Sequence, residues 1–231
     1  MSQNPISLDQ KFLPDQPLHP QSPAFFSQVS ELLDGQPKDP ASVEAALSGW
    51  DGVMEKIAGE LYHLGSMLIG EGEETIQLIE HVVANVDIPS CCDHLDASHK
   101  ARLALAAQAV TVLHKRDASA FVAPQEESGP VSCIEDDDLS AAGVTAAELE
   151  RMLTGPERMH LRAWLESLPV SQRTIFVLRA IGGLSSVEVA DLLAEDGGKL
   201  AEEWTPDTVR SSFRQALCSL ASQLIHATQG K

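Results

Sequence analysis

The stretch that decides the fold is SSVEVADLLAEDGGKLAEEWTPDTVRSSFRQALCSL, residues 185–220. Ser185 and Glu188 have the spacing of a capping box, in which the serine hydroxyl accepts a backbone N–H and the glutamate reaches back. Further on, Thr205-Pro206-Asp207 combines an N-cap residue, a proline at the first helical position and an acid in the first turn. We therefore predict a short helix from Ser185 and a longer helix from Thr205.

The longer predicted helix has two chemically different sides. Its apolar stripe consists of Val209, Phe213, Ala216, Leu217, Leu220 and Leu224. The opposite side carries Thr208, Arg210, Ser211, Arg214 and Gln215. A helix-turn-helix needs a second helix that buries one side and offers hydrogen-bonding groups to bases and phosphates on the other. The alternative is that the arginines are ordinary solvated charges, as on many amphipathic helices.

Eleven residues, 194–204, separate the two predicted helices, more than the usual turn of about 3–4 residues. This difference predicts an inserted surface loop, and Trp204 is expected to anchor its return to the core. Nearby Arg173 and Arg179 are candidates for contacts with phosphate or a partner protein. Ion pairs with Glu166 or Glu188 are the alternative for them.

Helices are also predicted for most of the rest of the chain. Only 4% of the 231 residues are aromatic while 43% are hydrophobic, so the core is expected to be aliphatic. Apolar residues recur at spacings of three and four from Val43 to Leu68, which is typical of one buried helix face. Further helices are predicted over 23–33, 73–86, 96–116, 145–153, 157–168 and 171–181, the last of them ended by Gly182-Gly183, since glycine is the usual left-handed terminator. In the 73–86 helix, Ile76, Ile79, Val82, Val83 and Val86 are expected to face inward and Glu73, Glu74 and Glu80 outward. We predict an all-α fold.

Charge divides the chain into two parts. Residues 151–231 hold nine basic and nine acidic side chains, whereas residues 1–150 hold seven basic and twenty-five acidic ones, which is the entire net charge of −18. We predict a Pro/Gln-rich tail over 1–38, a helical domain over 39–117, an acidic flexible linker over 118–142 and a four-helix domain over 143–231. The acidic run 135–138 is expected to be a solvated spacer. The alternative is a regulatory tether that competes with DNA for a basic surface.

Composition excludes several classes of protein. So acidic a chain rarely binds nucleic acid through broad phosphate contacts. The longest apolar stretch, 103–113, is too short to cross a bilayer, and no leader is recognised. Four cysteines do not make a disulfide framework, so we predict a soluble protein of a reducing compartment with ordinary thiols, Cys218 lying in the core.

Catalytic and metal-binding motifs are not evident. Cys91, Cys92, His94, His99 and Cys133 suggest a metal site, but adjacent cysteines lack the spacing of a zinc knuckle. No nucleotide-binding glycine loop, HExxH motif or nucleophile elbow is found. We expect neither enzymatic activity, nor a cofactor, nor a bound metal.

The C-terminal third carries a resemblance to a known family. The residues that carry it are Leu165, Leu168, Pro169, Arg173, Phe176, Leu178, Arg179, Gly183, Leu184, Ser185, Glu188, Val189, Ala190, Leu193, Thr208, Val209, Arg210, Ala216, Leu217 and Leu220. This pattern resembles region 4 of the sigma-70 family, most closely its extracytoplasmic-function branch. The resemblance implies a helix-turn-helix that reads the −35 promoter element, with Thr205, Thr208, Arg210, Ser211, Arg214 and Gln215 at the DNA.

A second, degenerate resemblance lies upstream. Residues 58–86, with Leu61, Leu64, Leu68, Gly70, Glu73, Glu74, Leu78 and Ile79, resemble region 2 of the same family. By this resemblance Glu73, Glu74, Gln77 and Leu78 would bind core RNA polymerase. The 97–116 helix would lie where the family reads and melts the −10 element.

The resemblance implies a bacterial, cytoplasmic transcription initiation factor whose partners are core RNA polymerase, promoter DNA and, in this family, often an anti-sigma factor. It implies no membrane association. The alternative is a sigma-like regulatory adaptor that binds a protein through its acidic N-terminal half and does not melt DNA. The 97–116 helix has no Trp, Tyr or Phe for stacking on unpaired bases, which favours the adaptor.

Overall fold

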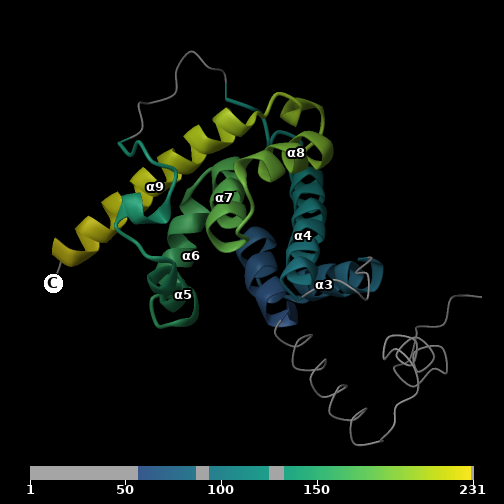
Figure 1. Cartoon of the computed structure of the whole chain (residues 1–231), viewed down its shortest axis with the longest axis horizontal. Coiled ribbons are helices and arrows are strands. Elements are labelled where there is room, and N and C mark those ends of the chain that lie inside the picture. The colour runs from purple at the N-terminus through teal and green to yellow at the C-terminus, as the bar shows by residue number, and fades with distance from the viewer. Residues whose placement is uncertain (1–56, 87–93, 125–132, 230–231) are drawn as a thin grey trace, which may run out of the picture. The chain divides into compact units, whose positions relative to one another are not determined.

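The computed structural model describes residues 57–86, 94–124 and 133–229, and these residues contain helices and no strand (Figure 1). The all-α prediction is confirmed. A helix over 57–69 is followed by α3 (Glu73–Asn85), α4 (His94–Arg116), η1 (Leu139–Ala142), α5 (Ala146–Thr154), α6 (Arg158–Ser167), α7 (Val170–Phe176), η2 (Val177–Ile181), α8 (Ser186–Asp196), η3 (Lys199–Ala201) and α9 (Pro206–Gln229). The predicted helix over 23–33 and the tail 1–38 lie outside the described residues.

Helix α4 contacts α3 near one of its ends and α8 near the other (Figure 1). Its buried side consists of Leu105, Ala106, Ala109 and Val110, all fully buried. Alanine lets a neighbouring helix approach closely, and Ala190 on α8 is likewise buried. The close packing of α4 on α8 therefore follows from small side chains on both helices.

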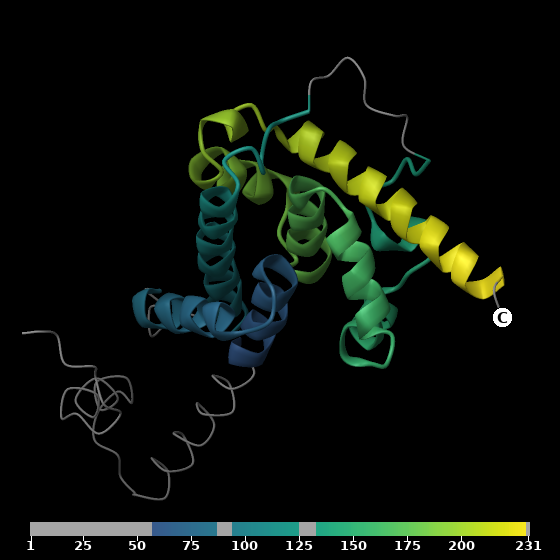
Figure 2. The ribbon, with the colours of Figure 1, turned by 180° about the vertical axis from the view of Figure 1, so that it is seen from behind.

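The few aromatic side chains are concentrated in the C-terminal part of the core. Trp164 of α6 meets Phe176 of α7 edge to face, with ring centroids 4.9 Å apart, and Phe176 lies 5.8 Å from Phe213 of α9. Each ring buries a large apolar area in a geometry that aromatic pairs favour. These contacts fix α9 against α6 and α7 (Figure 2).

Residues 51–231 form one compact unit, and the buried side chains on both sides of the predicted linker belong to one hydrophobic core. Contacts across it include the ion pairs of Arg158 and Arg162 with Glu71 and the hydrogen bond from Arg102 Nη1 to the Gly182 carbonyl, 3.0 Å long. The division into separate domains over 39–117 and 143–231 stays a prediction.

The described ends of the predicted linker are packed. Phe121 is fully buried, and Ile134 and Ala142 are 8% and 7% exposed. An unpacked linker would leave these apolar groups in water, whereas burying a phenylalanine contributes about 1.5–3 kcal/mol. Within the acidic run, Glu135, Asp136 and Asp138 are exposed, as expected of a solvated spacer. The predicted linker boundaries depend on charge and proline content, and neither of these predicts the burial of the three apolar residues.

Two of the inward positions predicted for α3 are wrong. Ile76 and Val83 are 42% and 43% exposed, whereas Leu78 and Val82 are buried. α3 packs on α4, and its buried residues Thr75, Leu78 and Val82 form a narrower stripe than its full set of apolar residues. Glu73, Glu74 and Glu80 are exposed, as predicted.

The predicted 171–181 helix is two elements. α7 ends at Phe176, and a π-helical turn, η2, carries Val177 and Leu178 into the core with both fully buried. The predicted glycine terminator is confirmed, since Gly183 has a φ of +67° in the left-handed region that favours glycine.

Gly198→Ala is expected to lower the free energy of unfolding by about 1–3 kcal/mol. Gly198 has a φ of +80°, and a Cβ there would collide with the imidazole ring of His114 on α4. Urea unfolding monitored by circular dichroism measures the loss. The matched control is Gly59→Ala, where no atom lies within 4 Å of the added Cβ and helix propensity favours alanine by up to about 1 kcal/mol. Equal stability of both variants would contradict the prediction.

Candidate nucleic-acid interface

Helix α8 begins with the predicted capping box. The Glu188 N–H donates to Ser185 Oγ over 3.2 Å, and the Ser185 N–H donates to Glu188 Oε2 over 2.7 Å. Glu188 also contacts His99 of α4, with Nε2 2.8 Å from Oε1. The hydrogen bonds from Ser185, with a smaller contribution from His99, hold the pKa of Glu188 below its ordinary value. One carboxylate thus starts α8 and joins it to α4.

This arrangement gives the stability a pH dependence. A carboxylate with a lowered pKa stabilises the fold above its unfolded pKa, about 4.3 for glutamate, and this contribution is lost as pH falls through the folded value. Glu188→Gln keeps the capping hydrogen bond but removes the charge at the helix N-terminus, and it is expected to cost about 0.3–1 kcal/mol at pH 7. Thermal unfolding of both proteins from pH 7 to pH 3 should show the difference narrowing below about pH 4.3. A difference that stays constant over this range would contradict the role assigned to the ionised carboxylate.

The connection between α8 and α9 is anchored to the core. α8 continues to Asp196, so the connection is shorter than the predicted insertion and contains the 3-10 turn η3. The prediction for Trp204 is confirmed: its side chain is 5% exposed, and Nε1 donates to the Phe121 carbonyl over 2.9 Å. The anchor fixes the position at which α9 begins.

Thr205 caps α9 as predicted. The Thr208 N–H donates to Thr205 Oγ1 over 3.2 Å, and the two hydroxyl oxygens lie 2.9 Å apart. Thr205 is exposed, so the first backbone amides of α9 lie near solvent. Such amides favour phosphate oxygens.

The side of α9 expected to meet DNA is partly covered. The predicted apolar stripe is confirmed, since Val209, Ala216 and Leu217 are fully buried. On the other side Thr208, Ser211 and Gln215 are half-buried. These three polar side chains follow one another at helical spacings, so they share one side of α9.

The two arginines predicted at the DNA have different surroundings. Arg210 is 41% exposed and forms an ion pair with Asp207, one turn earlier. Arg214 is half-buried, and its Nη1 donates to the backbone carbonyl of Glu135 over 3.0 Å. Arg210 is therefore open to a large ligand, whereas Arg214 is held by a neighbouring segment of the chain.

Arg179 binds the same segment. Its Nη2 lies 3.1 Å from Asp137 Oδ2, and its guanidinium carbon lies 5.1 Å from the centroid of the Phe213 ring. The alternative considered for Arg179 was an ion pair with Glu188, and the structure gives Asp137 instead. Arg173 is half-buried, and burial lowers the pKa of its guanidinium, while Glu166 pairs with Arg162 over 3.3 Å.

The residues expected to bind polymerase lie on α3. Glu73 and Gln77 are exposed and hydrogen-bonded to each other, with Gln77 Nε2 3.2 Å from Glu73 Oε1. Glu74 forms an ion pair with Arg116 of α4. Leu78 is 8% exposed and belongs to the core, so its side chain faces away from the surface that the other three share.

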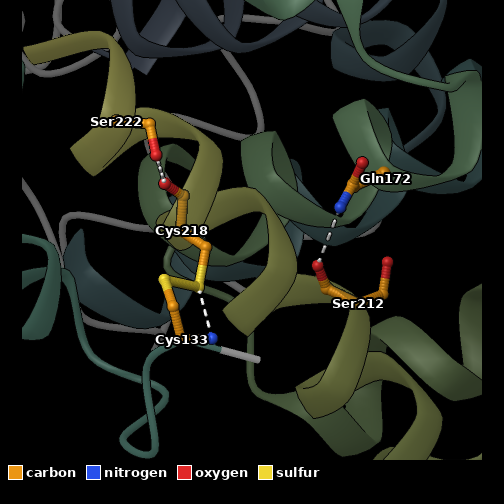
Figure 3. Close-up of a disulfide and its surroundings, with 5 residues drawn as sticks. All are labelled: Cys133, Gln172, Ser212, Cys218 and Ser222. Atoms are coloured by element: carbon orange, nitrogen blue, oxygen red, sulfur yellow. Dashed lines mark hydrogen bonds between the residues drawn. A yellow bond between two sulfur atoms is a disulfide. The ribbon is translucent and has the colours of Figure 1, made fainter. Parts of the chain in front are cut away.

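The prediction of ordinary thiols is wrong for one pair of cysteines. Cys133 and Cys218 form a disulfide, with their Cα atoms 5.8 Å apart, between residues 85 positions apart in the sequence (Figure 3). A local sequence motif cannot predict a bond between cysteines so far apart in the sequence. Cys133 is thereby unavailable to the metal site considered above, and Cys91 and Cys92 lie outside the described residues.

No group of three or more His, Cys, Asp and Glu side chains with metal-binding geometry occurs in the part of the chain that the structure describes. Among the same residues, no helix has both the length and the apolar character needed to cross a bilayer.

Comparison with known proteins gives no relative. No family model matches the chain, and neither a curated protein nor a solved structure does. The relation to the sigma-70 family therefore rests on the residues that carry the resemblance.

Proposed function

We propose that the chain is a sigma-factor-like transcription initiation protein that binds core RNA polymerase and recognises a promoter element through α9. The observation that carries the proposal is the start of α9. Thr205 caps this helix, Trp204 fixes its position, and a partly exposed polar side follows. A capped helix with a rigid entry can hold side chains at fixed positions in a major groove.

Each group on this side has a defined role in the proposal. Arg210 reads a guanine edge or binds a phosphate, and Ser211 and Gln215 contact neighbouring bases. Thr205 and Thr208 bring the N-terminal amides to a phosphate. Since the chain is strongly acidic, α9 would meet DNA only after polymerase has bound the protein.

Polymerase binding is assigned to the outer side of α3. Glu73, Gln77 and the exposed Ile76 offer one charged, one polar and one apolar group there. Leu78 can support this surface only from within, because it is buried.

A second candidate function is the adaptor, and the covered state of Arg214 favours it. Two cations of the helix expected to melt DNA are engaged as well: Arg102 donates to the Gly182 carbonyl, and Arg116 pairs with Glu74. An adaptor would need none of these groups at DNA. It would bind its protein partner through the acidic residues of the N-terminal half.

Run-off transcription with purified core polymerase on a pool of promoter fragments separates the two. A sigma-like factor should start transcripts at defined sites, and Arg210→Ala should lower their yield about 5- to 150-fold, which corresponds to a base contact of about 1–3 kcal/mol. The matched control is Arg151→Ala, which removes a guanidinium that is 76% exposed on α5. Polymerase binding without transcripts, unaffected by Arg210→Ala, would instead establish the adaptor.

A further inference from the structure

Residues 133–138, called the covering segment below, lie alongside α9 (Figures 1 and 2). Three of the contacts that hold them join them to α9 and η2. Cys133 is bonded to Cys218 of α9, Glu135 accepts a hydrogen bond from Arg214 of α9, and Asp137 pairs with Arg179. Figure 3 shows the disulfide, with the Cys133 N–H donating to Cys218 Sγ over 2.9 Å.

The covering segment occupies the side of α9 that carries the predicted base-reading arginines. Arg210, Arg214 and Cys218 follow one another at intervals of four residues, so they lie on one side of the helix. A chain fixed at Cys218 and at Arg214 blocks a duplex from reaching the guanidinium of Arg214. The covering segment also carries Glu135, Asp136, Asp137 and Asp138, whose negative charges repel phosphate.

The non-covalent contacts of the covering segment are weak by comparison. The Arg179–Asp137 ion pair is partly exposed, with 39% of the Asp137 side chain in solvent, and such pairs contribute little to stability. The Arg214 bond is a single hydrogen bond to a carbonyl, and the second bond of Arg179, to the Asp137 carbonyl, is 3.4 Å long. Ile134 is buried, and Asp138 caps η1. The disulfide shortens the tether between the covering segment and α9, which raises the effective concentration of these contacts.

We propose that the Cys133–Cys218 disulfide is a redox-controlled modification site that closes the covering segment over α9, and that its reduction by a dithiol uncovers Arg214. The inference rests on the proposed function, in which α9 reads DNA. It extends that function by assigning a regulatory role to the acidic run 135–138.

The chemistry is thiol–disulfide exchange. A reductant thiolate attacks Cys133 Sγ, forms a mixed disulfide and displaces the Cys218 thiolate. The second thiol of the reductant then displaces Cys133, so that two electrons and two protons pass to the protein and the dithiol becomes a disulfide. Cys133 is exposed and Cys218 half-buried, so the attack meets an accessible sulfur.

The test compares the oxidised full-length protein with the same protein reduced by dithiothreitol. The first readout is hydrogen–deuterium exchange of the peptic peptide that contains residues 133–138. The second is run-off transcription with core polymerase on the pooled promoter fragments. Cys133→Ser, at an exposed position, cannot close the bond. The matched control Cys91→Ser/Cys92→Ser retains it.

In the wild type and the control, reduction should raise both the exchange rate and the transcript yield at least tenfold. Without reductant, Cys133→Ser should already show the fast exchange and the high transcript yield of the reduced wild type. Exchange that does not change on reduction would overturn the inference and leave the proposed function standing. Increased exchange with equal transcription in both redox states would overturn the gating of DNA by the covering segment. Increased exchange with no transcription in either state would reject the proposed function and the gating that rests on it, while the redox-controlled closure itself would stand.

Discussion

Replacing Phe121 by alanine is expected to lower the free energy of unfolding by about 3–5 kcal/mol. The ring is fully buried, although it belongs to a segment with the composition of a linker. Its removal leaves a cavity beside the connection between α8 and α9, where the Phe121 carbonyl accepts the hydrogen bond from Trp204. The effect is large because a fully buried ring is lost and the cavity lies beside the anchor of α9, although the backbone carbonyl of residue 121 still accepts the Trp204 hydrogen bond.

Urea unfolding of three variants measures this effect. Phe121→Leu, which retains much of the volume, should lose less stability than Phe121→Ala and keeps the series measurable if the alanine variant does not fold. Val122→Ala, at a neighbouring side chain that is 49% exposed, should change the stability by less than about 0.5 kcal/mol. A loss below about 1 kcal/mol for Phe121→Ala would show that the segment is not packed as the structure has it.

Sequence reasoning succeeded where the determining interactions are local. The capping box at Ser185, the cap at Thr205 and the terminator at Gly183 each depend on residues within a few positions, and the structure has all three. Trp204 was also found, because a large aromatic residue after a run of glycine and acids needs a buried place. The start and end points of these helices in the C-terminal part of the chain could therefore be predicted from the sequence.

Sequence reasoning failed where the partner is distant in the chain. The burial of Phe121 depends on the connection some 80 residues later, and the Cys133–Cys218 bond spans 85 positions. Similarly, the exposure of Ile76 depends on which side of α3 faces its neighbouring helices, which helical spacing does not encode. For the candidate site, the polar residues of α9 lie outside its buried stripe, as predicted, and their contact with DNA stays a prediction. What covers them was considered only as the alternative of an acidic tether.

Reduction of the Cys133–Cys218 disulfide is expected to lower the free energy of unfolding by about 2–4 kcal/mol. The bond closes a loop between residues 85 positions apart, and breaking it restores conformational entropy to the unfolded chain. Urea unfolding with and without dithiothreitol measures the loss, while thiol titration counts the cysteines released. Cys133→Ser should unfold at the lower midpoint and should not respond to reductant, whereas Cys91→Ser/Cys92→Ser should respond as the wild type does. Release of two further thiols without a change in the urea midpoint would contradict the prediction. The disulfide would then hold the covering segment without stabilising the core, and its reduction would lower only the exchange protection of residues 133–138.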